Sequence, residues 1–373
     1  MEYKICTKCI MDTTDSEIEF DSNGVCNHCL RYEIELPKRV FIGSEAQKKF
    51  NDIINKIKNF GRKKEYDCII GVSGGVDSTY VAYLLKKNGI NPLAIHFDNG
   101  WNSELAVSNI EKTLDKLDID LYTYVIDWEE FKNLQLSFLK ASTPDGEIPS
   151  DHAINALLFR EASKRNIKYI VNGMNFSTES ISIKSWAYGH SDWKYIKSIH
   201  KIFGDVKLKN YPHYTFLNLF YWTFFKRIKV VSILNYINYN KEKVQELLEK
   251  ELDWVYYGGK HYESIYTRFF QGYILPKKFG IDKRRVHLSD LINSGQMLRK
   301  KALVEMEKPA MNSQLREQDE VFVLKKFNLT KIMFKKIMNL PKKTFRDYPN
   351  NFNRVSKLKE IVNFLRLKGW YSK

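Results

Sequence analysis

The segment "GVSGGVDSTY", residues 71–80, decides the fold because it sets a glycine-rich turn between two regular elements. An apolar run over 67–72 precedes the turn and predicts a buried parallel strand. From Ser78 onward the apolar residues recur at helical spacing until Gly89. The glycines let backbone N–H groups point inward, and the helix N-terminus adds partial positive charge. The segment therefore predicts a phosphate cradle, although it lacks the lysine of a Walker A loop.

The elements around this turn alternate between strand and helix. Strands are expected over 67–72, 92–97, 121–126 and 168–172, and helices over 44–60, 78–88, 103–117, 129–140 and 152–165. This order predicts an α/β fold with a doubly wound parallel sheet, which binds ligands at the carboxyl ends of its strands. We divide the chain into a cysteine module (1–36), a linker helix (37–65), the α/β domain (66–205) and a mostly helical, aromatic-rich, basic C-terminal domain (206–373).

Four of the five cysteines form two pairs near the N-terminus, "CTKC" (6–9) and "CNHC" (26–29). Two C-x2-C pairs at this separation predict a zinc ribbon or knuckle with four thiolate ligands. An iron–sulfur cluster is the alternative. Four thiolates leave no open position on the metal, so we interpret the zinc as structural and His28 as a neighbour. The predicted ligands are Cys6, Cys9, Cys26 and Cys29.

The composition favours an anionic partner. The chain has 60 Lys and Arg residues against 44 Asp and Glu residues, a net charge of +16 over 373 residues. Nucleic acid, a nucleotide sugar or a membrane surface would each suit this charge. The N-terminus does not resemble a signal peptide, and the most apolar stretch, 216–225, is too short to span a bilayer. A cytoplasmic location is therefore expected.

Polar residues follow two of the predicted strands at the edge where the loop lies. Together with the loop they predict a nucleotide site, in which Asp77 orders phosphate or Mg2+ and Glu179 serves Mg2+ through water. Taken singly, each residue is explained equally well as a turn or helix-cap residue. The predicted cofactor-binding residues are Ser73, Gly74, Gly75, Val76, Asp77, Ser78, Asp98, Asn99, Gly173, Asn175 and Glu179.

The string "SGGVDS" resembles the PP-loop of the N-type ATP pyrophosphatases, which include GMP synthetase, NAD synthetase, asparagine synthetase and the tRNA thiolases. Further motifs occur in order with it: "EIPSDHAI" (147–154), "YGGKHYES" (257–264), "RFFQGYILPKKFGIDKRR" (268–285) and "SGQMLRKKAL" (294–303). With the cysteine pairs, this combination is similar to the N-acetyl sugar amidotransferases of surface-polysaccharide synthesis (WbpG/PseA type), over roughly the first three hundred residues.

The resemblance implies an activity. ATP adenylates the oxygen of an acetamido group on a sugar or nucleotide sugar, and ammonia then displaces AMP to leave an acetamidino group. Such proteins serve the synthesis of lipopolysaccharide O-antigen or flagellin glycan. The chemistry needs positioning and charge compensation, without a covalent nucleophile.

Basic residues of the later motifs are candidate phosphate clamps. We expect Arg268, with Lys277 or Lys278, to join Ser73 and Asp77 in catalysis, and a solvated basic face explains most of the others. Asp151 is a helix cap by default and a substrate or metal contact by family position, and Lys184 is a weaker candidate. The full basic set is Lys260, Arg268, Lys277, Lys278, Lys283, Arg284 and Arg285.

The sequence contains no glutaminase signature, since residue 2 is Glu and Cys68 lies in a predicted core strand. The resemblance implies a separate glutaminase and a barrel-type subunit that delivers ammonia. The aromatic stretch 211–225 is a candidate docking surface, and a membrane-proximal segment or a core helix are the alternatives.

Two rival functions remain open. A tRNA thiolase would also join a PP-loop to cysteine pairs and bind a polyanion, but it needs an accessible cysteine for sulfur transfer. A non-catalytic nucleotide sensor would not need the intact loop. We therefore favour a sugar substrate over nucleic acid.

Overall fold

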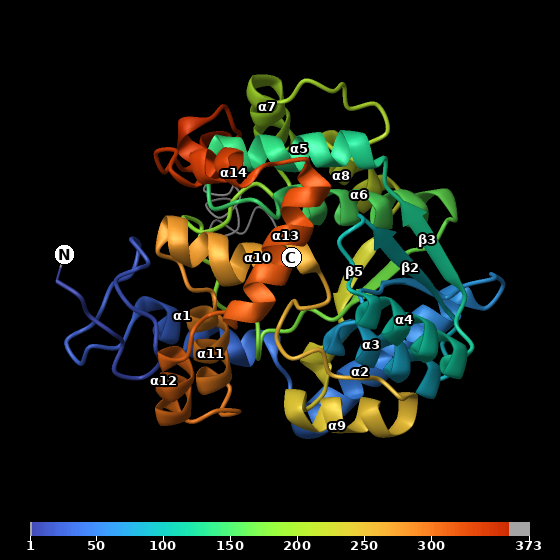
Figure 1. Cartoon of the computed structure of the whole chain (residues 1–373). Coiled ribbons are helices and arrows are strands. Elements are labelled where there is room, and N and C mark those ends of the chain that lie inside the picture. Colours follow the sequence, from blue (N-terminus) through green and yellow to red (C-terminus); the bar gives the residue numbers. More distant parts are fainter. Residues whose placement is uncertain (1, 358–373) are drawn as a thin grey trace.

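The computed structural model, which describes residues 2–357, is organised around one sheet of five parallel strands (Figure 1). The strands lie in the order β3-β2-β1-β4-β5. The sheet therefore grows from β1 to one side through β2 and β3, and to the other side through β4 and β5. At the centre of the sheet, Ile69 pairs with Leu93 on one side and with Ile170 on the other. The strands are β1 (Cys68–Gly71), β2 (Pro92–Asp98), β3 (Leu121–Val125), β4 (Tyr169–Asn172) and β5 (Lys229–Ser232).

Helices cover both faces of the sheet, because alternate strand residues enter two separate hydrophobic cores. On one face Cys68 and Ile70 pack with α2 (Gly43–Gly61), α3 (Val76–Lys87), α4 (Glu104–Leu117) and α9 (Lys241–Leu252). On the other face Ile69 packs with α5 (Trp128–Ala141), α6 (Ile148–Lys164) and α7 (Trp193–Phe203). The predicted doubly wound architecture is confirmed, and the expected strands and helices begin and end within a few residues of their predicted bounds.

The fifth strand corrects the predicted division of the chain. We expected a mostly helical domain without strand–helix alternation after residue 205, yet β5 pairs with β4 over four residues, from Tyr169 with Lys229 to Asn172 with Ser232. Its sequence, "KVVS", is too short to be distinguished from a loop by pattern alone. A boundary at 205 would therefore cut the sheet, and the boundary at 36 falls inside helix α1 (Asn27–Arg39).

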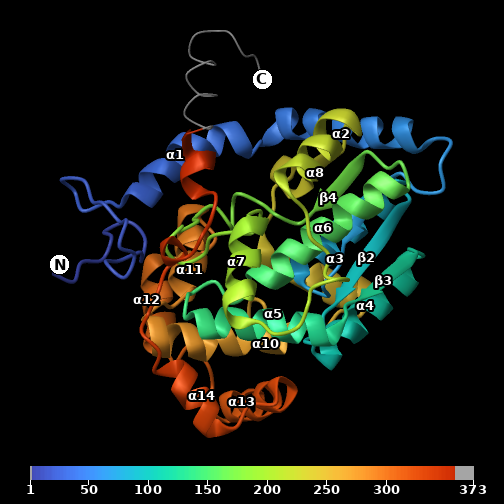
Figure 2. The ribbon, with the colours of Figure 1, turned by 90° about the horizontal axis from the view of Figure 1, so that it is seen from above.

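Most of the remaining helices pack into the core that contains α5 and α6, and several of those after residue 264 close over the carboxyl edge of the sheet. Buried aromatic residues such as Tyr266 and Phe270 anchor them there. Both ribbon views place the N-terminal cysteine module beside α11 and α12 (Figures 1 and 2). These elements are α8 (Phe216–Phe220), the π-helix η1 (Tyr221–Phe225), the short helix η2 (Ile233–Tyr236), α10 (Ile265–Phe269), the π-helix η3 (Phe270–Phe279), α11 (Arg284–Asn293), α12 (Arg299–Glu307), α13 (Ser313–Phe327), α14 (Lys331–Met338) and η4 (Phe345–Asp347).

Candidate active site

The glycine-rich loop lies between β1 and the first turn of α3, as the sequence predicts. Gly74 has a φ of +77°, and a Cβ there would lie 2.4 Å from the carbonyl oxygen of Ala106 on α4, so only glycine fits. The indole N–H of Trp254 donates to the Gly74 carbonyl oxygen at 2.8 Å. No side chain caps the N-terminus of α3, so its first N–H groups are available to an anion.

A cavity of about 190 Å³ opens at this loop. Ser73 and Ser78 hold their hydroxyl oxygens 3.4 Å apart at its floor. The end of β4 supplies Gly173, which carries no side chain because a Cβ would lie 2.8 Å from the backbone carbon of Asp77. Gly173 lines the cavity, as its prediction as a cofactor-binding residue requires, and its lack of a side chain lets the loop itself approach. The cavity therefore sits at the carboxyl edge between β1 and β4, where the direction of strand order reverses.

Three carboxylates line this cavity: Asp77, Glu179 and Glu263. Burial raises the pKa of Asp77, whose carboxylate accepts a hydrogen bond from the Tyr239 hydroxyl. Glu179 forms an ion pair with Lys260 at 3.1 Å. The Glu263 Oε2 atom is buried and has no hydrogen-bond partner in the described part of the chain. Carboxylate oxygens are the ligands Mg2+ prefers, so this donor set fits a magnesium ion that accompanies a nucleotide.

Glu263 was not among the residues that the sequence singled out. Burial alone would raise its pKa, but the adjacent His261, whose Nδ1 lies 3.6 Å from Oε1, lowers it below the usual range and keeps the carboxyl charged. The signal was present in the motif "YGGKHYES", where a carboxylate follows two glycines and a lysine. The sequence could not show that Glu263 lies at the loop, because almost two hundred residues separate the two and only the folded chain brings them together.

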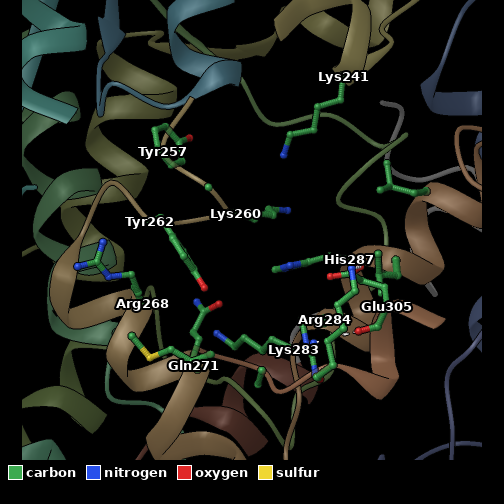
Figure 3. A pocket seen from close by; sticks show the side chains of 18 of the residues that line it. Lys241, Tyr257, Lys260, Tyr262, Arg268, Gln271, Lys283, Arg284, His287 and Glu305 are labelled. Atoms are coloured by element: carbon green, nitrogen blue, oxygen red, sulfur yellow. Dashed lines mark hydrogen bonds and ion pairs between the residues drawn. The ribbon is translucent and has the colours of Figure 1, made fainter. Parts of the chain in front are cut away.

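Lys241 is the second residue that sequence reasoning missed. It starts α9, and its side chain points into the space above Lys260 (Figure 3). In the described residues its ammonium group makes no ion pair and no hydrogen bond. Burial lowers its pKa, an effect that the nearby Asp77 carboxylate opposes. A cation held without a close partner between two cavities is available to an anionic ligand.

A larger cavity, of about 590 Å³, joins the first and shares four of its wall residues, Val76, Lys241, Tyr257 and Lys260. Its far wall comes from α10, η3, α11 and α12 (Figure 3). Lys283 and Gln271 there both bind Glu147, at 2.9 and 2.8 Å. The wall is strongly basic, with Arg268, Lys283, Arg284, Lys301 and Lys308, and its acids are Glu242, Asp282 and Glu305. Burial and the nearby Lys260 ammonium hold the pKa of His287 well below its usual value, so its imidazole is neutral.

Several predicted clamps are committed elsewhere. Arg268 lines the larger cavity, but its guanidinium binds Asp319 through two hydrogen bonds, at 2.7 and 2.6 Å. Lys278 is buried, donates to the Ile337 carbonyl oxygen, and has a pKa lowered to about 8 by burial. Lys277 is exposed and lines neither cavity. The prediction of Lys277 and Lys278 as catalytic residues is therefore wrong, because η3 turns both away from the site.

Other predicted contacts are also corrected, since none of the following lines either cavity. Asp98 accepts from the Gly100 N–H at 2.9 Å, and the Asn99 amide donates to Ser150. Asn175 accepts from the Thr178 N–H at 2.9 Å and so closes its own turn. Asp151 pairs with His190 at 3.1 Å. Asp98, Asn99 and Asn175 have the turn roles that were their ordinary alternatives, whereas Asp151 forms an ion pair in place of the expected helix cap.

Two basic candidates have structural roles. Arg285 forms an ion pair with Asp12 of the cysteine module at 3.0 Å, and Lys184 lies over the ring of Phe352. Arg284 binds Asp282, at 2.7 Å, in the wall of the larger cavity. Of the seven basic candidates, Lys260 alone faces both cavities.

The four N-terminal cysteines converge as predicted. Their sulfur atoms all lie within 4.8 Å of one another, with Cys9 and Cys26 3.7 Å apart and Cys6 and Cys29 4.0 Å apart. Thiolates around one tetrahedral ion at a metal–sulfur distance of about 2.3 Å would be roughly 3.8 Å apart, so the arrangement fits a single ion. His28 binds Asp15 at 2.7 Å and is a neighbour, as expected. Cys68 is fully buried in β1.

Helix α11 connects the cysteine module to the site. On one side Asn293 accepts from the Cys29 thiol at 3.3 Å, and the Ser289 hydroxyl accepts from the Ile10 N–H. On another side Asp290 accepts from the Ser180 hydroxyl and the Ile181 N–H, in the loop that carries Glu179. A third side lines the larger cavity through His287, Leu288 and Leu291. The cysteine module therefore supports a wall of the cavity.

The fold, the lysine-free loop and its cavity are similar to those of the PP-loop proteins, a class whose members use ATP. The family model described as "Queuosine biosynthesis protein QueC" matches residues 67–193. The chain also carries a second recognised domain: the family model "LPS biosynthesis protein WbpG-like, C-terminal domain" matches residues 263–359. The resemblance to the WbpG type drawn from the motifs is thus confirmed.

Curated relatives match the PP-loop part. The chain is 30% identical to the tRNA-specific 2-thiouridylase MnmA 2 of Fusobacterium nucleatum, covering 37% of this chain and 40% of the relative. It is 34% identical to the tRNA(Ile)-lysidine synthase of Chlamydia pneumoniae, covering 18% and 21%. The chain therefore spans less than half the length of these relatives.

Solved structures show similarity at low identity. The NMN synthetase of Francisella tularensis has a TM-score of 0.34 and 14% identity, covering 76% of this chain and 97% of that one. The U34-tRNA thiolase NcsA of Methanococcus maripaludis, with its [4Fe-4S] cluster, has a TM-score of 0.35 and 16% identity, covering 87% and 89%.

Proposed function

We propose that this chain is an ATP-dependent, AMP-forming amidotransferase that converts an acetamido group of a sugar or nucleotide sugar into an acetamidino group, in surface-polysaccharide synthesis. One observation carries the proposal: residues of the WbpG-like domain line a cavity of about 590 Å³ that shares a wall with the PP-loop cavity. A sugar in the larger cavity would present its amide to a nucleotide in the smaller one.

In the first step the amide oxygen attacks the α-phosphorus of ATP, the bond to the β-phosphate oxygen breaks, and pyrophosphate leaves. The N–H groups at the start of α3 and the hydroxyls of Ser73 and Ser78 are placed to hold the leaving pyrophosphate. Lys241 and Lys260 compensate its charge. Asp77, Glu179 and Glu263 would hold Mg2+, which neutralises phosphate charge when bound.

In the second step ammonia adds to the imidate carbon, the carbon–oxygen bond breaks, and AMP leaves with the former amide oxygen. One proton is lost from nitrogen, so the acetamidino group forms without oxidation or reduction. The protein supplies position and charge, and none of its five cysteines lines either cavity.

The proposed function also includes a structural metal ion and separate subunits that supply ammonia. We propose that the four-cysteine site holds structural Zn2+, because its sulfur spacing fits one tetrahedral ion. A glutaminase and a barrel-type subunit would supply ammonia as separate chains in the cytoplasm. Trp222, which lies in the candidate docking stretch 211–225, is buried and stacks on Phe159 with ring centroids 5.4 Å apart, so it belongs to the core.

The test is incubation of the purified chain with ATP, Mg2+, ammonium and UDP-linked, CMP-linked or free acetamido sugars. Mass spectrometry should detect exchange of the carbonyl oxygen for an imino group, with AMP and pyrophosphate formed in equal amounts. Pyrophosphate release that no sugar stimulates would refute the proposal.

The second candidate is a tRNA thiolase, which the 2-thiouridylase relatives favour. Thiolation would need a sulfur carrier near the nucleotide, and here the four N-terminal cysteines lie behind α11 while Cys68 is buried in β1. Sulfur incorporation into tRNA that is lost in Cys9→Ser would establish the thiolase in place of the amidotransferase.

A further inference from the structure

A patch of exposed rings and aliphatic side chains covers α8 and η1. Among its six members, Leu217 is 79% exposed, Phe225 70% and Phe224 59%. The rings contact one another, with Phe220 and Phe224 centroids 4.6 Å apart. We name this surface the aromatic patch, and it consists of Phe216, Leu217, Phe220, Tyr221, Phe224 and Phe225. Buried Trp222 fixes the patch to α6, so these side chains are held outward by the core beneath them.

The charge around the patch has one sign. From residue 206 to residue 241 the chain contains no Asp or Glu, although Lys and Arg recur through the segment. Lys226, Arg227 and Lys229 follow the patch directly, and the Lys226 ammonium lies 6.0 Å from the Tyr221 ring centroid. Rings that present a large apolar area next to cations suit the boundary between lipid headgroups and acyl chains.

The patch is also remote from the proposed chemistry. It runs directly into the amino end of β5, whereas the PP-loop follows the carboxyl end of β1, and the strands are parallel. No residue between 206 and 238 lines either cavity. A subunit seated here would not open onto the nucleotide, which argues against the patch as the entry point for ammonia. Within residues 2–357, no helix has both the length and the apolar character needed to cross a bilayer.

We propose that the aromatic patch docks the protein on an anionic membrane surface, with the rings at the level of the headgroups and Lys226, Arg227 and Lys229 against lipid phosphates. The attachment is peripheral and reversible, because ten residues of short helix insert only into the interface. The active-site cavities face away from the sheet's amino edge and stay open to solvent and to soluble partners. This inference is independent of the proposed reaction.

Vesicle flotation of the full chain tests the proposal. The vesicles contain either phosphatidylcholine alone or equal amounts of phosphatidylcholine and phosphatidylglycerol. We expect binding to the mixed vesicles only, weakened by salt because anionic lipid attraction is screened. The variant Phe220→Ser/Phe224→Ser/Phe225→Ser should lose at least tenfold in partitioning. The variant Lys226→Gln/Arg227→Gln/Lys229→Gln should lose roughly a hundredfold, from about 1 kcal/mol per cation.

Matched controls use exposed residues elsewhere. Val321→Ser/Ile332→Ser removes two exposed apolar side chains of α13 and α14, and Lys48→Gln/Lys56→Gln/Lys63→Gln removes three exposed cations near α2. Both controls should bind vesicles as the wild type does. Absence of binding to anionic vesicles overturns the proposal. So does a stable wild-type dimer, seen by light scattering, that the ring variant converts to a monomer, because the patch would then join two copies of the chain.

Discussion

Replacing Lys241 with methionine should separate activity from stability. Methionine keeps an unbranched apolar stem and removes the charge. In the described residues the Lys241 ammonium has no hydrogen bond or ion pair to lose, and burial already disfavours its charged form. We therefore expect the free energy of unfolding to stay the same or to rise by up to about 1 kcal/mol. The cation lines the cavity in which we propose that pyrophosphate departs, so kcat/KM for ATP should fall by two to three orders of magnitude, about 3 to 4 kcal/mol.

The assay is pyrophosphate release with saturating sugar and ammonium, beside urea unfolding of the same preparation. Lys243→Met is the matched control, because it lies on the same helix and is exposed. It should leave both measurements unchanged. Because burial lowers the pKa of Lys241, wild-type activity should decline on the alkaline side as the ammonium loses its proton, and Lys241→Met should lack that decline. A loss of stability that accounts for the loss of activity would show that Lys241 is structural.

Three further predictions concern the loop, the metal site and a buried histidine. Ser73→Ala should lower the rate of AMP formation by two to three orders of magnitude without destabilising the fold. Gly74→Ala should lower the rate and also destabilise the fold, because the new Cβ meets the Ala106 carbonyl oxygen. Equal unfolding curves for the two variants would contradict this geometry. Cys29→Ser, or removal of the metal by a chelator, should lower zinc content and the unfolding midpoint together. It should also raise the KM for sugar more than the KM for ATP, because α11 lines only the larger cavity. Iron and sulfide in the purified protein would refute the zinc assignment. Burial lowers the pKa of His152 to about 4, so the folded state binds fewer protons than the unfolded state. The free energy of unfolding should therefore fall by about 3 kcal/mol as the pH falls from above 6.5 to 4. Replacing His152 with Asn or Gln should remove this loss from acid-unfolding curves.

The local features of the site could be predicted from the sequence, and the long-range ones could not. The ten residues 71–80 and the segments next to them predict the loop, its strand and its helix. The spacing of the two cysteine pairs predicts a metal site. Basic candidates could be listed from motifs, but a motif does not show which cations are already paired. Arg268 meets Asp319 and Arg285 meets Asp12 across long stretches of chain, so only the folded structure removes them from the list. Nothing in the sequence distinguishes Lys241 from the other charged residues of its helix, because the larger cavity beside it is built by residues distant in the chain, among them Tyr257, Lys260 and those of α11.

Helix α11 explains why a cysteine module far from the nucleotide belongs to this site. Its three sides contact the module, the Glu179 loop and the larger cavity, through Asn293, Asp290 and His287 respectively. Burial raises the pKa of Asp290 to about 6, so holding its charge in this position costs free energy that its hydrogen bonds to residues 180 and 181 only partly offset. One helix thus contacts all three elements. The cysteine module, the Glu179 loop and the larger cavity should therefore respond together when any one of them is disturbed.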